Sequence, residues 1–242
     1  MRIPRVFVDQ TLISNAQILL GPEASHYLTR VLRLSIDAKI RVFNGQGGEY
    51  EAKILHSDRQ GVNIKLLTFS PPNNSSPLAI HLGIAISRGE RMDFVVQKAT
   101  ELGVAAITPL FSERCEVKLK NDRLEKKLTH WQKVSASACE QTGLNLLPKI
   151  YPPSSFYDWI NLADADLKLI LQPASENPLE TTVRPASIIL LIGPEGGFSN
   201  SEIAQAINAQ FCPLQLGPRV LRTETAPLAA LSILQYQWGD LA

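Results

Sequence analysis

The sequence predicts an α/β domain built on a parallel sheet, preceded by a small, mostly β domain with a barrel-like strand pattern. Short strands with alternating apolar residues, separated by turn residues, fill positions 1–70. A linker rich in proline and free of aliphatic and aromatic side chains follows at 71–77. From residue 78 to 242, apolar strands alternate with amphipathic helices, which is typical of a parallel sheet covered on both faces. We therefore expect domains at 1–70 and 78–242.

In the first domain, strands and one helix are expected. The strands lie within 2–8, 39–43, 49–56 and 62–69, and the glycine-containing turns at 44–48 and 58–61 separate the last three. A helix is expected over 22–34, with Pro22 in its first turn. Helical spacing places its apolar residues on one face and its basic residues on or near another; the apolar ones are Tyr27, Leu28, Val31 and Leu32.

In the second domain, five strands alternate with four helices. The strands are expected at 78–87, 105–111, 167–171, 187–192 and 213–216, and the helices at 91–102, 122–141, 202–209 and 227–238. The last helix is strongly apolar, so it suits either the domain core or a buried interface with a second copy; its large residues are Leu228, Leu231, Leu234, Tyr236 and Trp238.

Composition narrows the class of protein. The chain has 242 residues, of which 45% are hydrophobic and 19% charged, so bulk disorder is excluded. No apolar run is long enough to span a membrane. The three cysteines show neither pairing nor metal-ligand spacing, which indicates free thiols in a reducing cytoplasm.

The net charge of +1 conceals an uneven distribution. Residues 1–70 carry 9 basic and 6 acidic side chains, and residues 71–149 carry 11 and 8. Residues 150–242 carry 4 basic and 9 acidic side chains. The first two thirds can therefore present basic surface to phosphates, although scattered, solvated charge explains the same count.

Two glycine-containing loops each lie between an expected strand and an expected helix, where α/β proteins bind ligands. The first is Ile192-Gly193-Pro194-Glu195-Gly196-Gly197-Phe198-Ser199, and it matches neither the GxGxxG pattern nor a P-loop. The second, Leu216–Ala226, exceeds the usual length of about 2–6 residues. Either loop could instead be structural: Ser199 with Glu202 forms a capping box, and Thr225 can cap the last helix.

Together the loops closely resemble those of the bacterial 16S ribosomal RNA uridine-N3 methyltransferase family, within the SPOUT superfamily. Three further blocks are similar to that family in the same order: His26–Arg33, Arg91–Val104 and Glu140–Gly143. The resemblance covers the whole chain. One position departs from it, because Leu144 stands where the family usually has an arginine. If that arginine contacts RNA or a partner subunit, this chain must make the contact through another residue, for example Arg114 or Lys149.

The resemblance implies a PUA-like RNA-binding β-barrel at 1–70 and a SPOUT-type domain with a deep trefoil knot at 78–242. Periodicity alone predicts no knot, because ordinary chain connections avoid one. The resemblance also implies a cytoplasmic homodimer with the cofactor pocket near its interface. Its substrate is the 16S ribosomal RNA of the small ribosomal subunit.

The implied cofactor is S-adenosylmethionine, whose activated methyl group makes a metal or a covalent nucleophile unnecessary. The expected cofactor-binding residues are Leu171, Gly193, Gly196, Leu216, Gly217, Leu221, Thr223 and Ala226. Arg222 is expected to orient the uracil or stabilise its developing negative charge, and Glu195 to accept the N3 proton. These two could instead form a structural ion pair between the loops. The expected RNA-phosphate contacts are Arg30, Arg33, Arg88, Arg91 and Arg114.

Two other functions fit part of the pattern. A ribosome-assembly or RNA-binding protein without catalysis would keep the basic first two thirds but would be expected to lose glycines or threonines from the two loops. An enzyme acting on a small phosphorylated ligand would be expected to carry a P-loop or a dinucleotide fingerprint. The intact loops therefore favour the methyltransferase.

Overall fold

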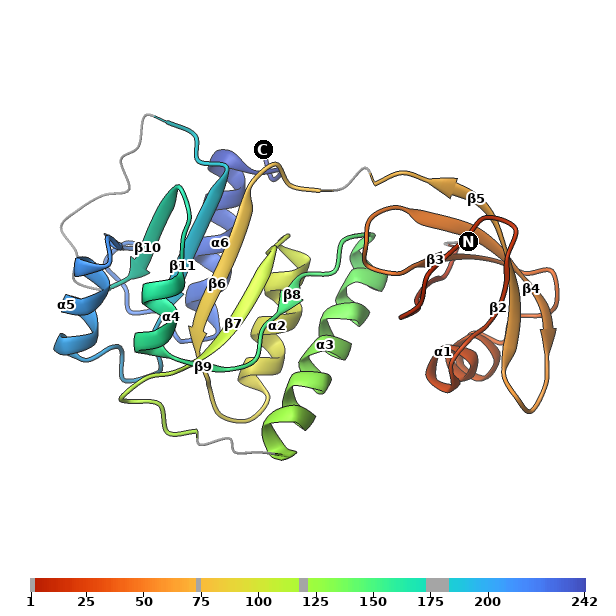
Figure 1. Cartoon of the computed structure of the whole chain (residues 1–242), viewed down its shortest axis with the longest axis horizontal. Helices are drawn as coiled ribbons and strands as arrows, with labels where there is room; N and C mark the ends of the chain where they lie inside the picture. Colours follow the sequence, from red (N-terminus) through yellow and green to blue (C-terminus); the bar gives the residue numbers. More distant parts are fainter. Residues whose placement is uncertain (1–2, 73–74, 118–121, 173–182) are drawn as a thin grey trace. The chain divides into compact units, whose positions relative to one another are not determined.

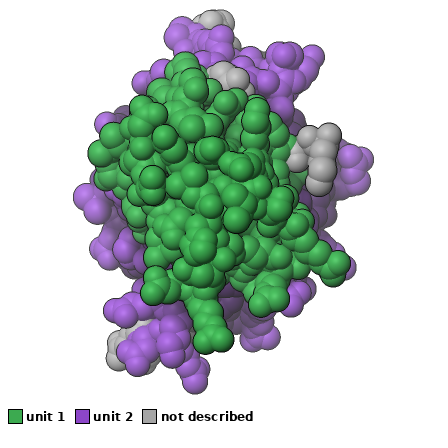
Figure 2. Space-filling model, turned by 90° about the vertical axis from the view of Figure 1, so that its right-hand side faces the viewer, with its two compact units in different colours: residues 1–75, 136–147 green, residues 76–135, 148–242 purple. Residues whose placement is uncertain are grey.

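A computed structural model describes residues 3–72, 75–117, 122–172 and 183–242. The chain divides into two compact units, coloured separately in Figure 2. The first comprises Met1–Ser75 and Ala136–Leu147, and the second Ser76–Ser135 and Pro148–Ala242. Residues 136–147 thus group with the N-terminal unit, outside the expected first domain. Residues 73–74 of the expected linker lie outside the described residues.

The first unit is built on a five-stranded sheet in the order β1-β3-β4-β5-β2 (Figure 1). Its strands are β1 (Arg5–Phe7), β2 (Gln17–Leu19), β3 (Lys39–Phe43), β4 (Glu49–Ser57) and β5 (Val62–Ser70). Only the β1–β3 pair is parallel among the described strands of this sheet. Alternate residues of β3, β4 and β5 point inward and form the core, including Ile40, Ile54 and Ile64. The mostly β domain is confirmed, and β2 is a strand that the sequence pattern missed.

The helix expected at 22–34 is divided into α1 (Pro22–His26) and a π-helical turn, η1 (Tyr27–Val31). The N–H of Leu32 donates to the C=O of Tyr27 at 3.0 Å, an i→i+5 bond. This widened turn changes the angular spacing of the side chains, so the single apolar face expected here is wrong in part. Leu28 is buried, whereas Tyr27 and Val31 are 40% and 60% exposed.

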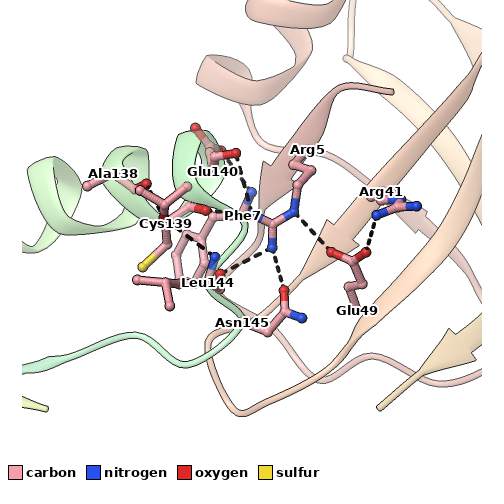
Figure 3. Close-up of polar contacts among 10 residues, drawn as sticks. Arg5, Phe7, Arg41, Glu49, Ala138, Cys139, Glu140, Leu144 and Asn145 are labelled. Atoms are coloured by element: carbon pink, nitrogen blue, oxygen red, sulfur yellow. Dashed lines mark hydrogen bonds and ion pairs between the residues drawn. The ribbon is translucent and has the colours of Figure 1, made fainter. Parts of the chain in front are cut away.

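The segment 136–147 is attached to the first unit by the buried side chain of Arg5 (Figure 3). The segment contains the last turn of helix α3 (Asp122–Thr142). The Arg5 guanidinium donates to the C=O groups of Cys139 at 2.5 Å and Leu144 at 3.1 Å, and to the side chain of Asn145. Carbonyl groups in the last turn of a helix lack intrahelical donors. The C=O of Cys139 accepts the N–H of Gly143, just after the helix, at 3.1 Å, and Arg5 adds a second donor to it. Through its bonds to Leu144 and Asn145, Arg5 also ties the following loop to β1.

Acidic side chains complete this network. Glu49 accepts from Arg5 at 3.0 Å and from Arg41 at 2.8 Å, so it balances the buried charge. Glu140 accepts the N–H of Phe7 at 2.8 Å, and its burial raises the pKa of its carboxyl group. Leu144 enters the network through its backbone carbonyl alone.

The second unit is built on a parallel sheet of seven described strands (Figure 1). Six follow the order β12-β10-β11-β6-β7-β8, and β9 also pairs with β7. The strands are β6 (Ala79–Ala85), β7 (Ala106–Phe111), β8 (Lys149–Ile150), β9 (Ser154–Ser155), β10 (Leu167–Leu171), β11 (Ser187–Ile192) and β12 (Cys212–Leu214). The expected parallel sheet is confirmed.

Helices cover both faces of this sheet (Figure 1). They are α2 (Arg91–Glu101), α4 (Phe156–Leu162), α5 (Asn200–Asn208) and α6 (Thr225–Trp238), together with the first part of α3. Ile188, Leu190 and Ile192 of β11 pack in a cluster with α2 and α6, while Ile189 and Leu191 pack with α4 and α5. Burial on both faces explains why these strands read as continuous apolar runs.

The last helix mainly serves the core. Leu231, Leu234 and Trp238 are buried, whereas Tyr236 is exposed. The helix begins after Glu224 without a side-chain cap, so the alternative role of Thr225 as a cap is wrong. Helix α4 and the two-residue strands β8 and β9 were not expected, because such short elements give little periodicity. Among the described residues, no helix combines the length and apolarity needed to cross a membrane.

Candidate active site

A cavity of about 700 Å³ lies where β10, β11 and β12 end. Its wall consists of residues after β10, the loop 193–198 after β11, and the loop 216–226 between β12 and α6. In parallel sheets, the carboxyl ends of neighbouring strands form such ligand sites because the loops diverge there. The volume falls within the range of about 300–1,000 Å³ that is typical of small-molecule sites.

Every residue expected to bind the cofactor lines this cavity. From β10 and the first loop come Leu171, Gly193 and Gly196; from the second loop come Leu216, Gly217, Leu221, Thr223 and Ala226. The expected catalytic residues Glu195 and Arg222 line it as well. The structure therefore brings together residues more than 50 positions apart in the sequence, and their individual roles stay predictions.

The first loop is shaped by hydrogen bonds at the start of α5. The expected capping box is present: Ser199 Oγ accepts the N–H of Glu202 at 3.2 Å, and Glu202 Oε2 accepts the N–H of Ser199 at 2.8 Å. The other Glu202 oxygen accepts the N–H of Glu113 at 2.9 Å. Gly197 has a φ of +66°, which favours glycine. Glu202 is fully buried, so its carboxylate fixes this loop against the residues after β7.

The second loop is fixed at its end by backbone hydrogen bonds, and it places both apolar and polar residues in the cavity wall. The C=O of Arg222 accepts the N–H groups of Thr225 and Ala226, both at 2.9 Å, and these bonds fix the turn into α6. Thr223 is buried, and Gly217 has a φ of +70°. The cavity thus combines apolar walls with charged side chains from both loops, as small-molecule sites commonly do.

The two expected catalytic side chains have different surroundings. Glu195 accepts from Arg91 Nη1 at 2.9 Å, so the suggested ion pair between Glu195 and Arg222 is not the one formed. Arg222 is exposed, and its guanidinium makes no hydrogen bond or ion pair with any described residue. Arg222 is therefore available to a ligand, whereas Glu195 already has a cationic partner.

The arginines expected to contact RNA occupy both units. Arg88, Arg91 and Arg114 belong to the second unit and line a second cavity beside the first. Arg114 donates to the C=O groups of Gly196 at 2.7 Å and Phe198 at 3.4 Å, so it also supports the first loop. Arg30 and Arg33 are exposed in the first unit.

Sequence reasoning missed several residues of the main cavity. Pro194, Phe198, Arg219 and Glu224 lie within the two loops already singled out, but nothing in the pattern tells which loop side chains turn inward. Gln172 could have been found, because it directly follows the expected strand 167–171 at the carboxyl end of the sheet. Among the described residues, no group of three or more His, Cys, Asp or Glu side chains could hold a metal ion.

Comparison with known proteins defines the class. A family model described as "RNA methyltransferase domain" matches residues 74–235, and one described as "RNA methyltransferase PUA domain" matches residues 20–67. The chain is thus an RNA methyltransferase whose methyltransferase domain is accompanied by a PUA domain.

Similar proteins and solved structures narrow the class of protein further. Ribosomal RNA small subunit methyltransferase E from Buchnera aphidicola subsp. Acyrthosiphon pisum is 38% identical over 241 residues, covering 99% of this chain and 95% of that protein. The same enzyme from Buchnera aphidicola subsp. Schizaphis graminum is 39% identical over 243 residues, covering 100% and 99%. The chain therefore belongs to the RNA methyltransferase family that contains ribosomal RNA small subunit methyltransferase E, and the expectation from the sequence blocks is confirmed.

Two similar solved structures contain bound SAM (S-adenosyl methionine). One, a methyltransferase structure from Legionella pneumophila, is 42% identical with a TM-score of 0.96 and covers 100% of both chains. The other, ribosomal RNA small subunit methyltransferase E from Neisseria gonorrhoeae, is 36% identical with a TM-score of 0.92 and the same coverage. The expected fold, an α/β methyltransferase domain preceded by a PUA-like domain, is confirmed. The trefoil knot stays a prediction.

Proposed function

We propose that this chain is an S-adenosylmethionine-dependent methyltransferase that methylates N3 of one uridine in the 16S ribosomal RNA of the small ribosomal subunit. One observation carries the proposal: two loops separated in sequence line a single cavity with every residue expected for cofactor binding and catalysis. The names of the relatives, and the cofactor in two similar structures, point to the same activity.

The cavity fits this cofactor. The side chains of Leu171, Leu216 and Leu221 provide apolar surface for an adenine ring, and the buried Thr223 adds a hydroxyl group. A Cβ atom added at Gly217 would meet nothing within 4 Å, so the backbone there is open to close approach. When bound, S-adenosylmethionine supplies an activated methyl group.

The protein's part in catalysis is to position and polarise the uracil. Methylation at N3 requires that the N3 proton leave and that negative charge develop on the base. Arg222, exposed and unpaired with any described residue, can hold that charge beside the cavity. Glu195 at the rim can accept the proton once its carboxylate has separated from Arg91.

The remaining expectations complete the proposal. The PUA-like domain at 1–70 would bind RNA through Arg30 and Arg33, and the domain at 78–242 would hold the cofactor. The enzyme would act as a cytoplasmic homodimer and use no metal. The exposed Ile233 and Tyr236 on α6 are apolar surface that a second copy could cover.

Two measurements test the proposed function. Calorimetry with S-adenosylmethionine should show binding, and its absence would favour an RNA-binding or assembly protein without catalysis. Arg222→Ala should then slow single-turnover methyl transfer on saturating substrate by about 100-fold, the effect of losing one charge-stabilising donor. Arg123→Ala, an exposed arginine on α3 outside the cavity, is the matched control. A normal rate for Arg222→Ala would remove it from the catalytic machinery.

A further inference from the structure

A second cavity of about 490 Å³ shares its boundary with the first. It lies at the carboxyl ends of β11, β6 and β7, which are neighbours in the sheet, whereas the first cavity lies at the ends of β12, β10 and β11. Arg91, Glu195 and Gly196 line both cavities. The loop after β11 is therefore a common wall between them.

The second cavity is strongly charged. Three arginines and two glutamates line it, with glycine at the remaining positions; these residues are Arg88, Arg91, Arg114, Glu116, Glu195, Gly89 and Gly196. Convergence of three guanidinium groups on one cavity creates a site for an anion, because each presents several N–H donors in a fork. A Cβ atom added at Gly89 would meet nothing within 4 Å, so the backbone leaves room for a ligand.

Carboxylates contact two of these arginines in the described structure. Arg88 Nη2 lies 2.6 Å from Glu116 Oε2, and Arg91 Nη1 lies 2.9 Å from Glu195 Oε1. The Arg88–Glu116 side chains are 69% and 64% exposed, and ion pairs this exposed to water are weak. A phosphodiester, like a carboxylate, presents two charged oxygens that can accept a pair of N–H bonds from one guanidinium group, so it can replace the carboxylates.

The third arginine has a different role. Arg114 already donates to the C=O groups of Gly196 and Phe198 in the common wall. Its charge contributes to the cavity, but its hydrogen bonds hold the loop in place. The exchangeable positions are thus those of Arg88 and Arg91.

We propose that the second cavity binds a phosphodiester of the substrate RNA next to the target uridine, and that this phosphate displaces Glu116 from Arg88 and Glu195 from Arg91. The inference rests on the proposed function, which it deepens by assigning where the RNA backbone is held. Because Glu195 lines both cavities, its displacement places a free carboxylate at the rim of the first one. Binding of the correct RNA backbone and exposure of the proton acceptor are then one event.

The proposal predicts effects of opposite sign for the two partners of one ion pair. Arg88→Ala removes a phosphate donor and should raise the KM for unmethylated small ribosomal subunits about tenfold, as expected for a charged hydrogen bond. Glu116→Gln removes the competitor and should lower that KM about two- to fivefold, the range for an exposed ion pair. A purely structural ion pair would instead make both variants less stable and neither better at binding. Arg123→Ala is the control for loss of one surface charge.

The assay measures initial rates against subunit concentration at several salt concentrations, with S-adenosylmethionine saturating. Arg88→Ala should also flatten the salt dependence of RNA binding by about one counterion, while Glu116→Gln should not. The cofactor also carries a carboxylate, which is a second anion that Arg88 could bind in place of the RNA phosphodiester. Calorimetry of the variant with S-adenosylmethionine distinguishes the two. If Arg88→Ala weakens cofactor binding instead of RNA binding, or if Glu116→Gln raises the KM, the proposal is overturned. If the wild-type protein neither binds the cofactor nor transfers methyl groups, the proposed function itself fails.

Discussion

Replacing Arg5 by alanine should destabilise the N-terminal unit more than any surface substitution in it. The Arg5 side chain is buried, and its nitrogen atoms contact Glu49, Asn145 and the C=O groups of Cys139 and Leu144. Three of these acceptors, in Cys139, Leu144 and Asn145, belong to the segment 136–147, which packs against β1 through them. The deletion therefore leaves the C=O of Leu144 and the side-chain oxygen of Asn145 without their donor, and it unpairs one oxygen of the buried Glu49.

The magnitude follows from these contacts. Removing one partner of a buried, hydrogen-bonded ion pair costs about 3–5 kcal/mol in free energy of unfolding. Arg41 provides the matched control, because it contacts the same Glu49 at 2.8 Å from a partly exposed position. Arg41→Ala should cost about 1 kcal/mol or less. Arg5→Lys should recover only part of the loss, since an ammonium group cannot reproduce the forked donors.

Chemical denaturation at neutral pH measures these differences, and hydrogen exchange locates them. Amides of residues 140–147 should lose protection in Arg5→Ala, while those of the parallel sheet should keep it. If Arg5→Ala costs no more than Arg41→Ala, the network does not hold the end of α3, and the reasoning from buried acceptors is refuted.

Three further substitutions test other parts of the structure. A Cβ atom at Gly83 would lie 2.2 Å from the Trp159 ring, so Gly83→Ala should lower the free energy of unfolding by about 1–3 kcal/mol or more. A Cβ atom at Gly193 would lie 3.2 Å from the Phe198 backbone and ring, so Gly193→Ala should weaken S-adenosylmethionine binding in calorimetry by about tenfold, or 1.4 kcal/mol. Burial lowers the pKa of His81 from 6.5 to about 4. As the pH falls, His81 is therefore protonated in the unfolded chain before it is protonated in the folded one. The free energy of unfolding should consequently fall between pH 6.5 and 4, by at most about 3 kcal/mol. Denaturation of His81→Gln as a function of pH should not show this loss.

Each of these has a contrary outcome. A stable Gly83→Ala would mean that Trp159 moves at little cost. Unchanged cofactor affinity in Gly193→Ala would mean that the loop tolerates the crowding or does not touch the cofactor. Equal pH profiles for the wild type and His81→Gln would show that the imidazole is protonated as easily in the folded chain as in the unfolded one.

Much of the fold could be predicted from local patterns. Strands β10 and β11 were predicted at their observed bounds, because burial on both faces gives uninterrupted apolar runs with clear ends. The π-helical turn after His26 was not predicted, since an i→i+5 bond depends on packing and leaves the composition of the segment unchanged. The attachment of 136–147 to the first unit was also missed: it depends on Arg5 and Asn145, which lie 140 positions apart.

The site was predicted more completely than the contacts inside it. The two loops were recognised by length, glycine content and resemblance, and all ten residues named for the cofactor and for catalysis line one cavity. The partner of Glu195 was not foreseen. Arg91 begins α2, and only the adjacency of β6 and β11 brings it to that loop. Strand order in a parallel sheet is a long-range property that periodicity does not encode.

The most direct test of the account is to identify the modified nucleoside. The protein is incubated with labelled S-adenosylmethionine and unmethylated small ribosomal subunits, and the digested RNA is analysed by mass spectrometry. The account predicts a single N3-methyluridine in 16S ribosomal RNA, formed about 100-fold more slowly when Arg222→Ala replaces the wild-type protein in a single turnover. Methylation at uridine C5 or at a ribose hydroxyl would contradict the assigned chemistry.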